Sequence, residues 1–183
     1  MKGKKTDMKK ILVVAAHPDD EILGVGATVA KHAAQGDEVY ALILGEGQTS
    51  RGEHREDISA DVVKELHQNT LESAEKVGYK EVYFADFPDN RFDQVDLLDV
   101  VKAVEHKIKE IQPEIIYTHY SGDLNIDHQY TARAVLTATR PIGDYPVKEI
   151  YAFETLSSTV HSLHSVRMCM WILRSSMPIR KQQ

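Results

Sequence analysis

The segment from Lys10 to Leu44 constrains the fold of this chain more than any other. Lys10 to Ala16 is a short apolar run, rich in β-branched residues and closely followed by a proline, which predicts a buried strand. Between Asp19 and Gln35 apolar residues recur at helical spacing, and Gly36 follows as a stop signal. Glu38 to Leu44 predicts a second strand. The segment therefore has the order and length of a βαβ unit.

The alternation of strands and helices continues along the chain. Further strands are predicted over residues 80–84, 114–118 and 148–153, and helices over 57–77, 95–111 and 128–139. Such alternation favours an α/β fold in which helices cover both faces of a mostly parallel sheet. In sheets of this kind, ligands bind outside the carboxyl ends of the strands. We therefore expect the polar residues that follow the strands to gather at one edge of the sheet.

The composition limits the class of protein. The 183 residues suffice for one domain with a core, and 42% hydrophobic with 27% charged residues is ordinary for a globular protein. A net charge of −6 argues against a nucleic-acid partner. Cys169 is the only cysteine, so no internal disulfide can form. Because no apolar run approaches the ~20 residues that span a bilayer, we expect a cytoplasmic protein without a membrane partner.

The composition changes sharply near the C-terminus. No acidic residue follows Glu154, although the whole chain has 28. We therefore divide the chain into a domain of residues 1–159 and an atypical tail of residues 160–183. The tail is either a native apolar closing segment or the product of a frameshift or truncation. The apolar residues of the tail could also form an interface between copies of the chain, so a homo-oligomer is a possible state.

The run His17-Pro18-Asp19-Asp20-Glu21 follows the first predicted strand and carries two adjacent aspartates. Like charges in one pocket repel and raise a pKa, and a divalent cation would relieve that repulsion. Zn²⁺ binds His nitrogen and Asp oxygen at about 2.0–2.2 Å, and catalytic sites combine three protein ligands with an open position. His17 and one aspartate would supply two ligands and leave the other aspartate to act on the water. The alternative is a capped helix start, which explains one aspartate but not the whole run.

A second polar segment, from Thr118 to His128, ends the fourth predicted strand and enters a helix. His128 could supply the third metal ligand, and Asp127 could orient a ligand ring from behind. The alternative is a polar loop in which an aspartate caps the helix. We interpret His119, alone at the strand end, as a structural residue.

Other polar residues fall in loops at the same edge. Arg51 could bind a substrate oxygen or could be a solvated loop charge, and Asp89, Asn90 and Arg91 are candidates of the same kind. Five further histidines share no partner pattern and are interpreted as surface residues: His54, His67, His106, His161 and His164.

Two glycines, Gly24 and Gly26, invite comparison with a dinucleotide-binding motif. That motif needs its first glycine directly after the strand, where the run from His17 to Glu21 stands instead. A redox enzyme that uses a nucleotide is therefore disfavoured.

The two polar segments together resemble a known family. Ala16 to Glu21 resembles the AHPDDE signature of the LmbE-like, or PIG-L, deacetylases, and Gly122 to His128 resembles that family's second histidine motif. The resemblance extends from about Lys10 to Thr159. It implies a Rossmann-like fold and a zinc-dependent hydrolase that removes the acetyl group from an N-acetylglucosamine-type sugar or a related small N-acyl compound.

The resemblance also assigns roles to residues. It implies that His17, Asp20 and His128 are the zinc ligands and that Asp19 is the general base. Asp127 matches a carboxylate behind the ligands.

One departure from the family concerns Asn125, since many members have a histidine there that helps to polarise the reacting carbonyl. Asparagine can donate a hydrogen bond to an oxyanion but cannot shuttle a proton. Oxyanion stabilisation would then fall to the metal, Asn125 and Arg51. The other departure is the tail after Thr159, which is not family-like.

Alternatives remain for the function and for the metal. The chain could be a non-catalytic relative that binds metal or sugar, or a hydrolase of a non-sugar amide or an ester. The ligand set would also accept Fe²⁺, Co²⁺ or Mn²⁺.

Overall fold

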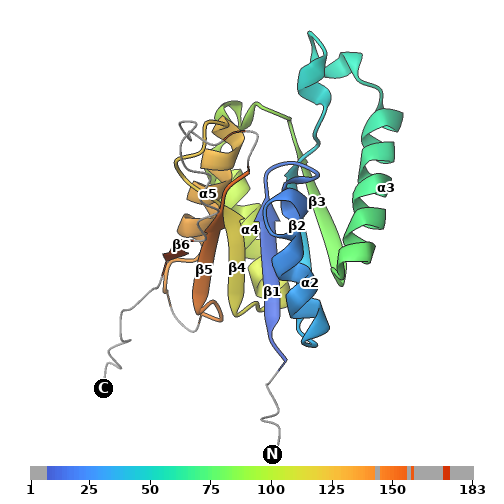
Figure 1. Cartoon of the computed structure of the whole chain (residues 1–183). Helices are drawn as coiled ribbons and strands as arrows, with labels where there is room; N and C mark the ends of the chain where they lie inside the picture. The colour runs from blue at the N-terminus through green and yellow to red at the C-terminus, as the bar shows by residue number, and fades with distance from the viewer. Residues whose placement is uncertain (1–7, 143–144, 156–157, 159–170, 174–183) are drawn as a thin grey trace, which may run out of the picture.

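The centre of the fold is a six-stranded sheet in the order β3-β2-β1-β4-β5-β6 (Figure 1). The computed structural model describes residues 8–142, 145–155, 158 and 171–173. Neighbouring strands from β3 to β5 are parallel, and β6 is antiparallel to β5. The strands are β1 Lys10–Ala15, β2 Glu38–Gly45, β3 Glu81–Phe87, β4 Ile115–His119, β5 Glu149–Phe153 and β6 Trp171–Leu173. The predicted mostly parallel α/β sheet is confirmed.

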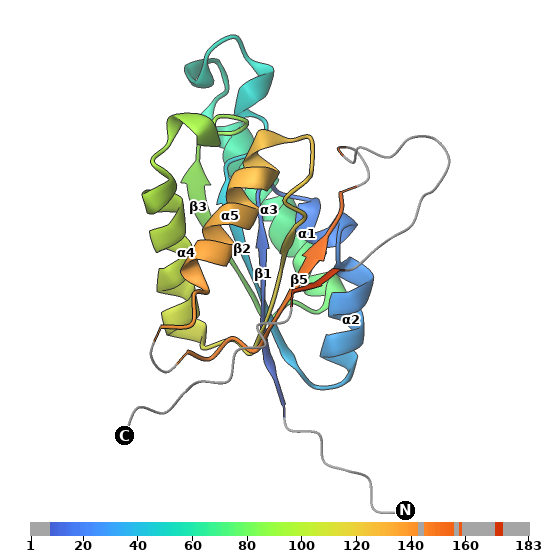
Figure 2. The same cartoon turned by 90° about the vertical axis from the view of Figure 1, so that its left-hand side faces the viewer.

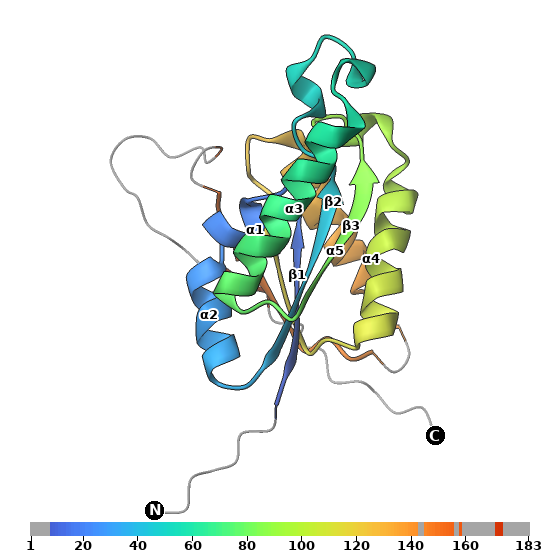
Figure 3. The ribbon, with the colours of Figure 1, turned by 90° about the vertical axis from the view of Figure 1, so that its right-hand side faces the viewer.

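Helices cover both faces of the sheet. The helices are α1 Asp20–Leu23, α2 Gly26–Ala34, α3 Ala60–Val77, α4 Leu97–Ile111 and α5 Ile126–Ala138, and short 3₁₀ turns span Thr49–Arg51, Arg55–Asp57 and Phe92–Gln94. Figure 2 shows α4 and α5 on one side of the sheet and α1 and α2 on the other. Figure 3 shows α3 beside α2, so three helices share that second face.

The buried residues of β1 explain why its sequence is apolar throughout. Leu12 and Val14 belong to the core under α4 and α5, whereas Ile11 and Val13 belong to the core under α1, α2 and α3. All four side chains are fully buried. A strand covered on both faces reads as a continuous apolar run rather than an alternating one.

The single helix predicted from Asp19 to Gln35 was wrong, because the structure divides it into α1 and α2 near Gly24. A Cβ atom at Gly24 would lie 2.3 Å from the ring of Phe153, so only glycine allows β5 to pack this closely. Val25, the next residue, leaves the helical region with φ −136°. The short α1 thus belongs to the loop that carries the motif, while α2 is the helix that returns the chain to β2.

Other predicted boundaries shift by a few residues. The helix predicted from residue 57 begins at Ala60, after a 3₁₀ turn, and β3 extends to Phe87 beyond its predicted end at residue 84. The helix predicted from His128 begins at Ile126, which places His128 inside the first turn. This last shift fixes the direction of the His128 side chain.

Only part of the atypical tail lies within the described residues. Trp171–Leu173 forms β6 and pairs with β5, with Ala152 opposite Trp171. His161, His164 and Cys169 lie outside the described residues. The division into residues 1–159 and 160–183 stays a prediction, as does a homo-oligomer. Over the part of the chain that the structure describes, no helix has the length and apolar character to cross a bilayer.

Candidate metal centre

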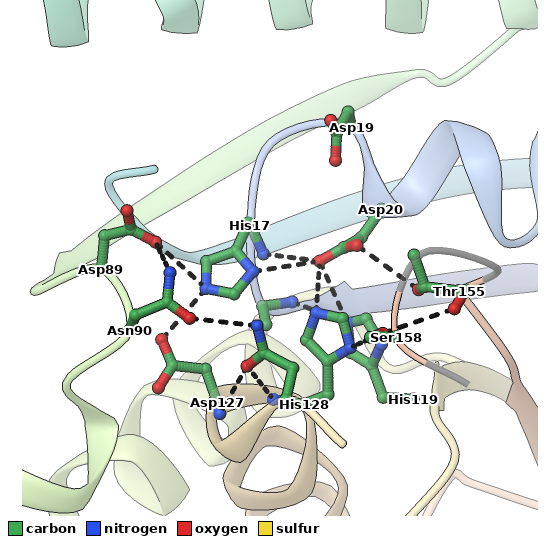
Figure 4. Close-up of polar contacts among 12 residues, drawn as sticks. His17, Asp19, Asp20, Asp89, Asn90, His119, Asp127, His128, Thr155 and Ser158 are labelled. Atoms are coloured by element: carbon green, nitrogen blue, oxygen red, sulfur yellow. Dashed lines mark hydrogen bonds and ion pairs between the residues drawn. The ribbon is translucent and has the colours of Figure 1, made fainter. Parts of the chain in front are cut away.

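The polar residues that follow β1 and β4 meet at one edge of the sheet, as predicted. β1 and β4 are neighbours, so the loops at their carboxyl ends emerge side by side. His17 and Asp20 come from the loop and helix after β1, and His128 comes from the first turn of α5 after β4 (Figure 4). Side chains more than a hundred positions apart in the sequence are thereby brought into contact.

The three predicted ligands converge on one another. Asp20 Oδ2 lies 3.4 Å from His17 Nδ1 and 3.2 Å from His128 Nε2. The three candidate ligand atoms all lie within 4.8 Å of one another, and Asp20 and His128 are each only 3% exposed. Two imidazole nitrogens and one carboxylate oxygen, almost buried and directed at one point, fit the donor set of a Zn²⁺ site.

His17 is held from behind by two carboxylates. Its Nε2 lies 3.0 Å from Asp127 Oδ2 and 3.3 Å from Asp89 Oδ1, which leaves Nδ1 for the metal position. Asp127 is itself fixed, because its Oδ1 accepts a hydrogen bond from the Phe92 N–H at 3.0 Å. Burial acts to lower the pKa of His17, but the hydrogen bonds with Asp127 and Asp20 outweigh it and raise the pKa to about 10. The surroundings therefore favour a positive charge at this point, as a cation site requires.

The role of Asp89 was missed by sequence reasoning, which considered it only for substrate binding. Asp89 is 4% exposed, and its Oδ2 accepts hydrogen bonds from the N–H and hydroxyl of Ser50 at 3.1 and 2.6 Å. These bonds connect the loops after β2 and β3 to His17. In the sequence, only the position of Asp89 after a predicted strand could have indicated its contact with His17.

His128 is oriented in the same manner, by a residue that was not singled out. Its Nδ1 lies 3.1 Å from Asp123 Oδ2 and 3.3 Å from Ser158 Oγ, so Nε2 is left to face Asp20. Burial acts to lower the pKa of His128, but Asp123 and Asp20 outweigh it and raise the pKa. A carboxylate behind a histidine ligand is a recurrent feature of metal sites.

His119 has the structural position expected for it. Its Nε2 accepts a hydrogen bond from the Ala16 N–H at 3.0 Å, which joins the ends of β1 and β4. Its ring stacks on His128 with centroids 3.9 Å apart. Burial outweighs the contact with Asp20 and lowers the pKa of His119 to about 4, so the ring stays neutral at pH 7. His119 therefore supports the ring of His128 from the side.

Asp19 is exposed and has an unusual backbone conformation. Its φ is 99°, a left-handed value that is uncommon outside glycine and often marks functional sites. Its carbonyl accepts the N–H groups of Ile22 and Leu23, but its side chain makes no capping hydrogen bond. The capped-start alternative thus fails for Asp19, and its carboxylate is free to interact with a ligand. Burial and the nearby charge of Asp20 raise the pKa of Asp19.

Asn125, rather than an aspartate, caps α5. Its Oδ1 accepts the N–H groups of Asp127 and His128 at 2.8 and 3.4 Å, and its Nδ2 donates to Asn90 Oδ1 at 3.0 Å. The amide has a second N–H, so a hydrogen bond to a substrate stays possible in chemical terms. Its role at an oxyanion stays a prediction.

Arg51 lies at the end of the 3₁₀ turn Thr49–Arg51 and is exposed. Its positive charge is close enough to Asp19 to oppose the rise in the pKa of that carboxyl. This places Arg51 in the electrostatic neighbourhood of the site, and its contact with a substrate stays a prediction.

The surface interpretation of the other described histidines holds for two of three. His54 and His106 are exposed. For His67 the interpretation was wrong, because its ring is half-buried and stacks on Phe84 with centroids 3.8 Å apart. Its Nε2 lies 3.5 Å from Asp86 Oδ1, so its partners within the described residues differ from those of the three ligands.

A family model matches residues 12–139, which include both polar segments. It is described as PIG-L, GlcNAc-PI de-N-acetylase. The chain belongs to the PIG-L family. Among curated proteins, this PIG-L chain is 29% identical over 155 residues to the uncharacterized deacetylase YaiS of Escherichia coli K12, covering 82% of the chain and 76% of YaiS. Matches to two other curated relatives cover 40% and 60% of their lengths.

Solved structures share the fold of this PIG-L chain. The N,N′-diacetylchitobiose deacetylase from Pyrococcus horikoshii has a TM-score of 0.65 and 21% identity, covering 83% of the chain and 62% of that structure. GalB from Pseudomonas putida, a 4-carboxy-2-hydroxymuconate hydratase, has a TM-score of 0.63 and 24% identity. That match covers 79% of the chain and 65% of the GalB structure. Since one is a deacetylase and the other a hydratase, the fold alone does not fix the reaction.

Proposed function

We propose that this PIG-L chain is a metal-dependent deacetylase that hydrolyses the acetamide of an N-acetylglucosamine-type sugar. The observation that carries the proposal is the convergence of His17 Nδ1, Asp20 Oδ2 and His128 Nε2 beside the exposed carboxylate of Asp19. The family description, a de-N-acetylase of an N-acetylglucosamine compound, supports the substrate class.

The proposed metal is zinc, held by His17, Asp20 and His128. Bound there, Zn²⁺ would polarise the acetyl carbonyl and make a water a better nucleophile near neutral pH. The same donors would also accept Fe²⁺, Co²⁺ or Mn²⁺. Asp127, Asp89 and Asp123 are proposed to keep the two imidazoles oriented, since each lies within 3.3 Å of a ring nitrogen that faces away from Asp20.

Asp19 is proposed as the group that moves the proton. Its carboxylate accepts the proton of the attacking water and then delivers it to the nitrogen of the leaving amine. Asp19 is exposed and its side chain caps no helix N–H, which suits a group that must first accept a proton and then release it. The second N–H of Asn125 and the guanidinium of Arg51 are proposed to stabilise the negative charge that develops on the acetyl oxygen.

The test combines metal content with acetate release on N-acetylglucosamine and N,N′-diacetylchitobiose. Asp19→Asn should retain one metal per chain and lose about 10²–10⁴-fold in kcat, the usual effect of removing a general base. Full metal-dependent activity of this variant would show that the base is assigned wrongly.

A panel of acylated compounds separates the alternatives. Bound metal with no acetate release from any N-acetyl sugar would indicate a binding protein without catalysis. Amine release from N-acetyl amino acids, or hydrolysis of an acetate ester, in preference to the sugars would assign the same site to another bond.

A further inference from the structure

Glu21 has no part in the proposed chemistry, yet it is completely buried beside Asp19. Its side chain is 0% exposed, and a buried carboxylate needs a hydrogen-bonded partner because its desolvation is costly. That partner is the N–H of Asp19, which donates to Glu21 Oε2 at 3.0 Å. Among the described residues, Oε1 of Glu21 has no hydrogen-bond partner.

The conformation of Asp19 is unusual for the start of a helix. A residue at this position normally has an extended backbone, and its own side-chain oxygen accepts an N–H of the first turn. Asp19 has neither property, since its φ is 99° and its side chain caps nothing. Instead, Glu21 reaches back from the first turn to the preceding N–H, as the acidic residue of a capping box does.

Glu21 is anchored from the far side. The hydroxyl of Tyr79, itself 7% exposed, donates to the backbone oxygen of Glu21 at 2.9 Å. The backbone of Glu21 is thereby tied to the segment before β3, and its side chain extends from this anchored point to Asp19. This bond acts on the backbone of Glu21 and not on its carboxylate, which is the group that accepts the Asp19 N–H.

On its carbonyl side Asp19 is restrained by the first turn of α1, since its oxygen accepts the N–H groups of Ile22 and Leu23. A cavity of about 200 Å³ borders Asp19 and Glu21 on one side and is lined on the other by residues of α3, including Leu66 and Asn69. Open space therefore adjoins Asp19 on the side of α3. Among the described residues, the side chain that accepts the Asp19 N–H is that of Glu21.

We propose that Glu21 is a positioning residue, whose buried carboxylate holds Asp19 in its left-handed conformation. Glu21 would thereby keep the Asp19 carboxylate beside His17 and Asp20, where Figure 4 shows it. The inference rests on the proposed function, in which Asp19 moves the proton. It assigns to the last residue of the motif a task distinct from metal binding.

The decisive property of Glu21 is its reach and not its charge. Glu21→Gln removes the charge but keeps the chain length and an oxygen that can accept the Asp19 N–H. Glu21→Asp keeps the charge but is one methylene shorter, so its oxygens fall short of that N–H. Tyr79→Phe is the matched control, since it removes a hydrogen bond to the backbone of Glu21 and leaves the carboxylate in place.

The kinetic experiment compares these three variants with the unaltered chain on N,N′-diacetylchitobiose, with metal content measured for each. Misplacing a reacting group by about 1 Å can cost 10²-fold in rate. We expect Glu21→Asp to lower kcat at least ~20-fold with KM changed less than ~3-fold and one metal per chain retained. Glu21→Gln should stay within ~5-fold of the unaltered kcat and Tyr79→Phe within ~3-fold.

Two kinetic outcomes would overturn the proposal. One is a kcat for Glu21→Asp within ~3-fold of that for Glu21→Gln, which would show that reach is irrelevant. The other is loss of metal from Glu21→Asp, which would show that the residue acts on the ligand Asp20 instead.

A second measurement does not depend on activity. The hydrogen exchange rate of the Asp19 amide, followed by NMR, reports the bond to Glu21 directly. It should rise at least ~10-fold in Glu21→Asp and stay near the unaltered rate in Glu21→Gln and Tyr79→Phe. If the unaltered chain releases no acetate, the proposed function fails while this rate still tests the hydrogen bond. An unchanged rate in Glu21→Asp refutes the positioning role itself.

Discussion

Replacing Asp123 by asparagine should weaken metal binding without touching a ligand. Asp123 Oδ2 lies 3.1 Å from His128 Nδ1, and Asp123 Oδ1 accepts the Asn125 N–H at 2.9 Å. When Nε2 of His128 binds a metal, Nδ1 carries the ring proton, so both carboxylate oxygens of Asp123 would then face N–H donors. An asparagine side chain has one acceptor oxygen. Its NH₂ group would therefore face either the Asn125 N–H or the His128 Nδ1–H, and two donors cannot form a hydrogen bond with each other.

The size of the effect follows from burial. The side chains of Asp123 and His128 are 0% and 3% exposed, so solvent screens their interaction little. Replacing such a partner of a metal-bound histidine typically costs 10–100-fold in metal affinity. For this buried pair we expect the upper part of that range, about 30–100-fold, which corresponds to roughly 2–2.7 kcal/mol.

The assay is a titration of the metal-free protein with Zn²⁺ in competition with a chelating dye, at fixed pH and salt. Asp37→Asn is the matched control, because Asp37 Oδ2 lies 2.7 Å from His32 Nδ1 in another aspartate–histidine pair. His32 is on α2, outside the candidate site. An affinity for Asp123→Asn within threefold of the unaltered protein, or an equal loss in Asp37→Asn, would refute the reasoning.

Two further substitutions test local features of the structure. Gly24→Ala would place a Cβ 2.3 Å from the Phe153 ring. We therefore expect the free energy of unfolding to fall by about 1–3 kcal/mol. An unchanged denaturation midpoint would contradict this packing. Asn125→Ala removes the cap of α5 and should cost about 1 kcal/mol, measured by urea denaturation. Asn125→Asp restores the capping oxygen and should recover the stability. It should not recover kcat if the Asn125 amide N–H also donates to the acetyl oxygen. Recovery of both stability and kcat would show that Asn125 has no part in the reaction.

The sheet could be predicted from the sequence because its central strands are covered on both faces. That covering makes β1 and β2 continuous apolar runs, which stand out between polar loops. The split between α1 and α2 could not be predicted, since it depends on the approach of Phe153 to Gly24. Helical periodicity records which side chains are buried and not which distant strand passes close by.

The three metal-ligand candidates could be found from the sequence because each lies in a compact polar segment at a predicted strand end. The carboxylates that contact these ligands could not be found in the same way. Asp89 and Asp123 look like ordinary loop aspartates, and their contacts with His17 and His128 arise only when separate loops meet. The hydrogen bond between Glu21 and Asp19 could not be predicted either, because it depends on a backbone angle of Asp19 that no residue pattern in the motif specifies.

The position of β1 next to β4 has a consequence for how the protein folds. β2 and β3 extend the sheet on one side of β1, while β4 joins it from the other side only after most of the described chain has been made. His17 and Asp127 are 110 positions apart, so their contact requires closing a long loop, and such non-local pairings form slowly. During synthesis, the first βαβ unit carries His17 and Asp20 without His128. At the proposed site, tight metal binding would therefore require that the second half of the sheet has docked onto the first.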